Sequence, residues 1–234
     1  MRVRIYLEGG GEKGQSKKGL DVKARQALKT FLISALKKQY PYSEGMDEYL
    51  NVIPCGTRRM AYKHFSNALE RRNRGEDKEK GEVLLLVDSE DPIKTVNPWE
   101  HLKGREGDQW ERPNGATDEH AHLMVHCMEN WFLADPQALR AYFGQDFNNS
   151  ALSTTHTVED VLKSVVLQEL EKASSGTTKG KYGKGKHSFD IFEKMDPIKV
   201  QDRAPWFCRL LKTLDNIMIH KRHNKSTRQC KTPC

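Results

Sequence analysis

The chain has 234 residues and a formal net charge of +7, and 36 % of its residues are hydrophobic while 30 % are charged. A chain of this length can bury a core without disulfide or zinc staples, and its five cysteines lack the spacing of either framework. Its longest apolar run is far shorter than a membrane span, and the first residues lack the apolar segment of a signal peptide. We therefore expect a cytoplasmic protein with no membrane partner.

The first ninety residues alternate between short apolar runs and apolar residues at helical spacing. This pattern predicts strands at residues 3–7, 51–56 and 83–87 and helices at about residues 21–40 and 58–74. A β-α-β-α-β order is typical of a parallel sheet joined by right-handed crossovers. We expect an α/β fold with a mostly parallel sheet and helices on both faces.

The sequence pattern of the second half of the chain predicts fewer strands and more helix. We expect a loop at 91–121, a strand at 122–128, helices at 136–142, 158–172 and 206–218, and a Gly/Lys/Ser loop at 173–188, with Thr157 capping the second helix. These elements make one domain over residues 1–219, with a core at 1–145 and a helical, basic-loop extension at 146–219. Residues 220–234 form a basic tail that we expect to be disordered.

Carboxylates follow three of the predicted strands. Glu8 follows the first, Asp88 and Glu90 follow the strand at 83–87, and Glu129 follows the strand at 122–128. Open α/β sheets bind ligands at the carboxyl ends of their strands, and clustered carboxylates are costly unless a cation neutralises them. If the chain stays extended there, Asp88 and Glu90 point to the same side. Each acid alone could belong to an ordinary turn, but together they favour a Mg²⁺ or Mn²⁺ site.

Basic residues outside the strands suit a polyanionic partner. The candidates for holding phosphates are Arg58 and Arg59 at a helix start, and Lys181, Lys184, Lys186 and His187 in the loop at 173–188. Within this set, Lys184, Lys186 or His187 could also stabilise a leaving oxygen. The alternatives are an ordinary helix cap by Thr57 with exposed arginines, and a flexible, solvated loop.

The segment at residues 9–16 is similar to a nucleotide-binding P-loop, because glycines follow a strand. Gln15, however, occupies the position of the lysine that a P-loop needs, and the helix is expected to begin only near residue 21. We therefore do not expect NTP hydrolysis. The glycines would instead let the backbone approach a phosphate or a metal beside Glu8.

The acidic pattern resembles the Toprim fold of topoisomerases, primases and OLD-type nucleases. In that fold a glutamate follows the first strand and a D-x-D motif follows the third, and Mg²⁺ supports phosphodiester chemistry. Glu8 matches the first element, and Asp88-Ser89-Glu90 matches the second with a longer final side chain. The resemblance implies a Toprim-like, Rossmann-like core.

The chain resembles still more closely a family described as domain-of-unknown-function family 4276, related to RloB-type proteins. The resemblance rests on four segments in order, at residues 5–11, 87–92, 123–135 and 179–189. It implies a context in bacterial anti-phage defence with an ABC-type or AAA-type ATPase as protein partner.

Two functions remain open at this stage. The first is a Mg²⁺-dependent nuclease acting on DNA or RNA, with Glu8, Asp88, Glu90 and Glu129 as metal ligands and Glu8, Asp88, Glu90, Lys184 and Lys186 as catalytic residues. The second is a non-catalytic Toprim-like subunit that regulates an ATPase complex. Phosphate-binding lysines carry no base information, so the choice between DNA and RNA stays open, as does assembly into a homo-oligomer.

Overall fold

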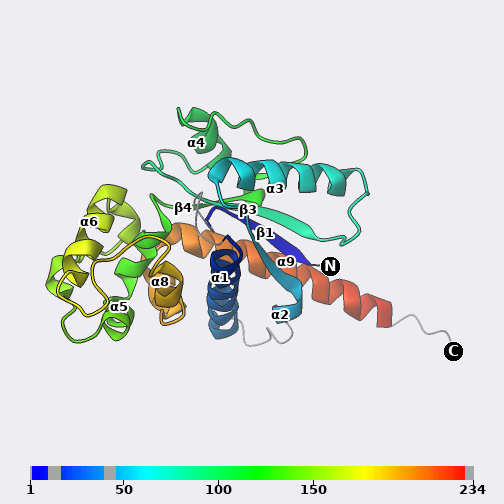
Figure 1. The fold of residues 1–234 in the computed structure, drawn as a ribbon. Coiled ribbons are helices and arrows are strands. Elements are labelled where there is room, and N and C mark those ends of the chain that lie inside the picture. Colours follow the sequence, from blue (N-terminus) through cyan, green and yellow to red (C-terminus); the bar gives the residue numbers. More distant parts are fainter. Residues whose placement is uncertain (1, 10–16, 40–45, 230–234) are drawn as a thin grey trace.

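The computed structural model describes residues 2–9, 17–39 and 46–229 of the chain (Figure 1). Four strands form one sheet in the order β2-β1-β3-β4, and every neighbouring pair is parallel. The strands are β1 (Val3–Leu7), β2 (Leu50–Pro54), β3 (Glu82–Asp88) and β4 (Ala121–Met124). The α/β class with a Rossmann-like parallel sheet is therefore confirmed.

The two central strands are apolar on both faces because helices cover both sides of the sheet. All five residues of β1 are buried, as are six of the seven residues of β3. Leu7 of β1 pairs with Leu86 of β3, and Asp88 pairs with Met124 of β4. This register brings the carboxyl ends of β1, β3 and β4 to the same edge of the sheet.

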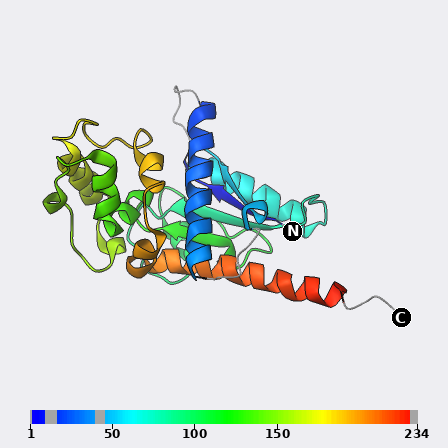
Figure 2. The ribbon, with the colours of Figure 1, turned by 90° about the horizontal axis from the view of Figure 1, so that it is seen from below.

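Each face of the sheet carries its own apolar core. On one face, α3 (Arg58–Asn73) and α4 (Pro98–Gly104) pack over residues such as Val83 and Leu85. On the other face lie α1 (Lys17–Gln39) and α9 (Pro205–Gln229), which cross beneath the strands (Figures 1 and 2). Thr57 caps α3 with a hydrogen bond from the Met60 amide at 3.3 Å, which is the alternative that the sequence left open for this helix start.

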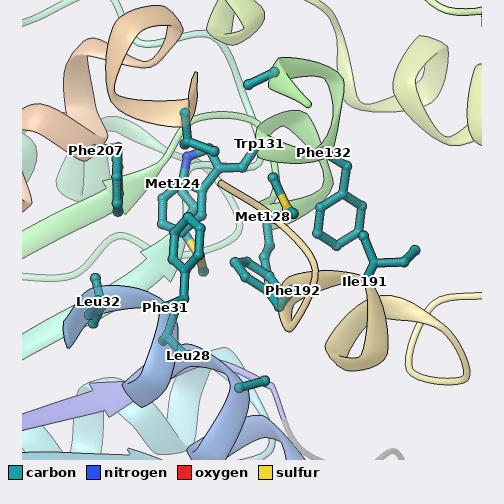
Figure 3. Close-up of a cluster of buried hydrophobic side chains, with 14 of the residues drawn as sticks. Leu28, Phe31, Leu32, Met124, Met128, Trp131, Phe132, Ile191, Phe192 and Phe207 are labelled. Atoms are coloured by element: carbon teal, nitrogen blue, oxygen red, sulfur yellow. The ribbon is translucent and has the colours of Figure 1, made fainter. Parts of the chain in front are cut away.

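The helical extension, which in the structure comprises the elements from η2 through α8, lies at one end of the sheet and shares the core of the α1 face (Figure 1). It contains the helices α5 (Pro136–Phe143), α6 (Lys163–Ser174), α7 (Ser188–Phe192) and α8 (Pro197–Arg203), and the 3-10 segments η2 (Met128–Ala134), η3 (Asn149–Ala151) and η4 (Val158–Asp160). Two further short elements, α2 (Met46–Tyr49) and η1 (Asp118–His120), lie outside it. Figure 3 shows the aromatic cluster that joins the extension to α1 and α9. In it, the Trp131 ring lies 4.9 Å from Phe207 and 6.2 Å from Phe31 between centroids.

The fourth strand is shorter than predicted. β4 ends at Met124, whereas the sequence prediction continued the strand to residue 128. His126 adopts a left-handed φ of 57°, and the chain then enters η2, so Glu129 lies in a 3-10 turn and does not follow a strand directly. Short apolar runs do not distinguish a buried strand from a buried helical turn, which explains the error.

The stretch at 91–121 is not all loop, because it contains α4. Asn97 caps this helix by accepting hydrogen bonds from the amides of Trp99 and Glu100, and Pro98 occupies its first turn. Proline at the start of a helix is favourable, so this proline marked a helix start and not a break. Trp99 and Trp110 are both buried in the α3 face, where they anchor the segment.

The helices of the second half also differ in their bounds. The single helix predicted at 158–172 is divided into η4 and α6, and the Thr157 side chain makes no capping hydrogen bond. The last helix continues to Gln229, so residues 220–229 of the expected tail are helical, since lysine and arginine are good helix formers. The first helix begins at Lys17, earlier than expected. Residues 10–16, which carry most of the P-loop-like segment, and 230–234 lie outside the described residues.

Within the described ranges, the chain offers no helix with the length and apolar character that a membrane crossing requires.

Two leucines near α6 provide a test of how the extension packs. Leu170 is fully buried in the core, whereas Leu162, just before α6, is 51 % exposed. We expect Leu170→Ala to lower the free energy of unfolding by about 2–5 kcal/mol, because it leaves a cavity. The same change at Leu162 should cost less than about 0.5 kcal/mol. Urea unfolding measures both, and equal losses would contradict this packing.

Candidate metal centre

Three carboxylates converge at the carboxyl edge of the sheet. One oxygen from each of Glu8, Asp88 and Glu90 lies within 4.8 Å of the other two. Glu8 follows β1, and Asp88 is the last residue of β3, so the parallel register of these strands brings the two side chains together. The backbone amide of Asp88 donates a hydrogen bond to Glu8 Oε2 at 3.3 Å. The acidic cluster that the sequence predicted therefore forms from residues far apart in the chain.

Ser89 fixes the turn that places Glu90. Its hydroxyl accepts a hydrogen bond from the His126 amide at 2.7 Å and donates one to the carbonyl of Asp91 at 2.7 Å. Glu90 has a left-handed φ of 64°, and its amide bonds to the carbonyl of His126 at 3.0 Å. The sequence analysis placed Asp88 and Glu90 on one side on the condition that the chain stays extended, but the chain is not extended after β3. Glu90 reaches the cluster through this turn.

Asp88 is the buried centre of the cluster, with 3 % of its surface exposed. Its Oδ1 accepts a hydrogen bond from the Met128 amide at 2.9 Å, at the start of η2. Burial, together with the negative charges of Glu8 and Glu129, raises the pKa of Asp88 to about 7, although Lys184 and Lys163 act to lower it. A buried carboxyl with this environment favours a bound cation, which would hold it in the charged form.

Arg58 holds Glu8 in place. Its Nη1 donates to Glu8 Oε2 at 3.1 Å and also to the carbonyl of Asp88. Its Nε and Nη2 donate to the two oxygens of Asp108 at 2.8 and 2.6 Å, and its guanidinium lies 5.0 Å from the centre of the Trp110 ring. Because its donors are engaged in this way, Arg58 positions the cluster, whereas the sequence assigned it to phosphate binding.

Two lysines from the extension reach the acids. Lys163, at the start of α6, bonds to Glu90 Oε2 at 2.5 Å and lies 4.0 Å from Asp88 Oδ2. Lys184, in the loop before α7, lies 3.4 Å from Asp88 Oδ2 and 3.6 Å from Glu129 Oε2. Burial lowers the pKa of Lys184, but the carboxylates of Asp88 and Glu129 raise it by more, so it lies above its usual value. Lys184 therefore stays charged beside the acids.

Glu129 is fully buried and is not one of the three clustered acids. Its Oε1 accepts a hydrogen bond from the Tyr182 hydroxyl at 2.9 Å, and that hydroxyl also contacts Ser188 Oγ at 2.8 Å. Its Oε2 has no hydrogen-bond partner. Glu129 thus contacts the cluster through Lys184, the cation that it shares with Asp88.

The remaining candidate residues do not meet the acids. Arg59, Lys181 and Lys186 are exposed. His187 is buried, its Nδ1 accepts a hydrogen bond from the Gly183 amide at 3.0 Å, and its ring packs against Tyr142, Phe143 and Tyr182. His187 therefore shapes the loop that carries Lys184.

Gly9 supports the edge beside Glu8. It exchanges two backbone hydrogen bonds with Gly56, at 2.9 and 3.0 Å, and its φ of 117° is one that residues with a side chain rarely adopt. This pair of hydrogen bonds joins the end of β1 to the residues just before α3, the helix that carries Arg58. The glycine is thus part of the scaffold of the cluster.

The sequence argument did not single out Lys163, Tyr182 or Asp108. Lys163 lies in a helix without a distinguishing pattern, Asp108 lies in a stretch expected to be loop, and Tyr182 was one residue of a glycine-lysine segment. The one signal in the sequence was an aromatic residue among lysines and glycines, because a tyrosine in a solvated loop would expose its ring; in the structure Tyr182 is buried.

The donor set fits a hard divalent cation. Mg²⁺ and Mn²⁺ prefer oxygen ligands, and Glu8, Asp88 and Glu90 present three carboxylates from a rigid strand edge. The unpartnered Oε2 of the buried Glu129 also indicates that the region is built around positive charge. Glu8, Asp88 and Glu90 would hold the ion.

Comparison with known proteins gives one match. The sequence model of the family described as "Domain of unknown function (DUF4276)" matches residues 8–215. The chain belongs to this family. Neither the curated proteins nor the solved structures contain a significant match. The matched range includes Glu8, Asp88, Glu90 and both lysines, so the whole site lies within the family domain.

The raised pKa of Asp88 predicts a pH-dependent stability in the metal-free protein. Because the folded-state pKa of about 7 exceeds the unfolded value of about 3.9, the folded state binds the extra proton, and the free energy of unfolding falls as pH rises between these values. Asp88→Asn removes this titration and keeps an acceptor for the Met128 amide. We expect its stability relative to wild type to be higher at about pH 8 than at about pH 5.

Urea unfolding at the two pH values, in the presence of a chelator, measures this difference. Every other titratable group is common to both proteins. A difference between variant and wild type that does not change with pH would contradict the burial of a charged Asp88.

Proposed function

We propose that the protein is a Mg²⁺-dependent or Mn²⁺-dependent nuclease of Toprim type that cleaves phosphodiester bonds in DNA or RNA. The observation that carries the proposal is the convergence of Glu8, Asp88 and Glu90 within 4.8 Å at the edge of a parallel sheet. Carboxylates of this kind, with lysines around them, are what metal-assisted phosphodiester hydrolysis requires.

The residues of the chain would divide the chemistry as follows. Glu8, Asp88 and Glu90 would hold a Mg²⁺ or Mn²⁺ ion, which would supply Lewis-acid polarisation of the phosphodiester and a more acidic water. Glu8, oriented by Arg58 and by the Asp88 amide, would accept a proton from the attacking water. Lys184, whose side chain is 53 % exposed, can also reach a phosphate in solution, and it would stabilise the charge on the leaving oxygen.

The exposed lysines of the same loop would hold the nucleic acid backbone. Lys181 and Lys186 are exposed beside Lys184, and α9 ends in a basic segment after Asp215. Contacts to phosphates supply affinity without base selection, so the proposal covers both DNA and RNA. The resemblance noted in the sequence supports a setting in the bacterial cytoplasm, with an ATPase as partner in anti-phage defence.

One observation favours the second function, a non-catalytic subunit of an ATPase complex. Lys163 and Arg58 already form ion pairs with Glu90 and Glu8. These pairs neutralise the acids without any metal, so the cluster could serve only to join the sheet to the extension. Metal binding distinguishes the two functions.

The nuclease proposal predicts metal-dependent cleavage that needs the clustered acids. We expect cleavage of single-stranded or double-stranded DNA or RNA with Mg²⁺ or Mn²⁺, alone or with the ATPase partner, and a loss of at least about 100-fold in Asp88→Asn and Glu8→Gln. Asp91→Asn is the matched control, because Asp91 is exposed, bonds to Arg105 and lies outside the cluster. Cleavage that survives in both cluster variants would exclude this assignment.

Metal binding also predicts a change in stability. A ligand that binds only the folded state raises the free energy of unfolding by about 2.7 kcal/mol at a concentration 100 times its Kd. We expect added Mn²⁺ to raise the melting temperature of the wild-type protein and to have little effect on Asp88→Asn. Thermal melts with and without Mn²⁺ measure both. An equal response of the two proteins would favour the non-catalytic subunit.

A further inference from the structure

Asp88 and Glu129 share the ammonium group of Lys184. Lys184 Nζ lies 3.4 Å from Asp88 Oδ2 and 3.6 Å from Glu129 Oε2. Glu129 is 0 % exposed, and this oxygen has no hydrogen bond. A buried carboxylate oxygen without a hydrogen bond is costly, so the charge of Lys184 is the interaction that compensates it.

Lys184 brings a positive charge to Asp88, beside any ion that the three-carboxylate group would hold. Two-metal phosphoryl-transfer sites place their ions about 3.5–4 Å apart, with a carboxylate in contact with both. Here Asp88 belongs to the group with Glu8 and Glu90, and it also faces Lys184. Glu129 is the second carboxylate in contact with the Lys184 ammonium group.

Lys184 is held in this position by the loop around it. Tyr182 is buried, and its hydroxyl bonds to Glu129 Oε1 at 2.9 Å. On the other side, Ser188 Oγ accepts a hydrogen bond from the Gly185 amide at 3.2 Å, and His187 accepts one from the Gly183 amide. His187 and Ser188 therefore fix the backbone on both sides of Lys184, and Ser188 also contacts the Tyr182 hydroxyl that bonds to Glu129.

The two lysines differ in what they contact. Lys163 bonds to Glu90, which is a member of the three-carboxylate group, so an ion bound by that group has to displace it. Lys184 contacts Asp88 too, but its second partner, Glu129, lies outside the group and can hold it in place when the ion binds. Removing the two lysines should therefore have different consequences.

We propose that the centre binds a single divalent cation through Glu8, Asp88 and Glu90, and that Lys184, paired with Glu129, supplies the second positive charge in place of a second ion. This inference rests on the proposed metal-dependent function and specifies its cation requirement. Glu129 is accordingly a positioning residue for Lys184 in the wild-type chain, not a metal ligand.

Titration of the full chain with Mn²⁺ tests the proposal, with the number of bound ions measured by calorimetry and the coupling between ions by electron paramagnetic resonance. We expect one ion per chain in the wild type, without coupling between manganese ions. Lys184→Met should bind two ions with coupling, because Asp88 and Glu129 then lack their cation. Lys163→Met, the same substitution at the other lysine, should still bind one ion, at least about tenfold more tightly, because a competing charge is gone.

The double variant Lys184→Met/Glu129→Gln completes the test. It should bind one ion again, because the second site depends on the Glu129 carboxylate. Lys194→Met is a control for the substitution itself, since Lys194 is exposed in the turn after α7. Circular dichroism verifies that each variant is folded.

Several results would overturn the proposal. Two ions in the wild type, or a single ion in folded Lys184→Met, would show that Lys184 does not replace a cation, while the nuclease function would stand. Two ions in the double variant would remove Glu129 from the argument. No ion in the wild type would refute both this inference and the metal-dependent function. If a variant does not fold, the number of Mn²⁺ ions bound by the wild-type chain decides the question by itself: one ion supports the proposal, and two ions or none contradict it.

Discussion

The burial of Asp88 at the end of β3 is the constraint that the surrounding structure has to satisfy. A carboxylate with 3 % of its surface exposed, close to Glu8, Glu90 and Glu129, is stable only if positive charge and hydrogen bonds surround it. The chain supplies the hydrogen bond from the start of η2 and the charge from Lys163 and Lys184. Each of these groups comes from the extension and not from the sheet that carries the acid.

The same constraint explains the arrangement around Glu8. Arg58 is fixed by Asp108 and Trp110 on the α3 side of the sheet, and it delivers one nitrogen to Glu8. A guanidinium with several fixed donors holds a carboxylate in one orientation better than a free lysine could. The acids are therefore compensated from both faces of the sheet, by an arginine on one side and by lysines on the other.

Much of the sheet and of the acidic cluster follows from local sequence patterns. Buried apolar runs at β1 and β3, with helices between them, require a parallel order, and a parallel order places Glu8 and Asp88 at one edge. The partners of these acids could not be predicted in this way. Lys163 and Asp108 are ordinary charged residues in the sequence, and only long-range packing brings them to the site. Glu129 was placed near the site for an incorrect reason, because the strand that should have carried it ends at Met124.

The contacts of Asn130 have a consequence for how the domain can be divided. Its side-chain amide donates to the carbonyls of Val158 and Val161, at 2.8 and 2.7 Å, just before the helix that begins with Lys163. These hydrogen bonds hold the segment that follows β4 against the residues just before α6. A fragment cut near residue 145 would keep all four strands and the acidic edge, but it would lose every lysine that balances them. The extension therefore supplies the cations of a site whose acids lie on the sheet, and the two parts also share one apolar core.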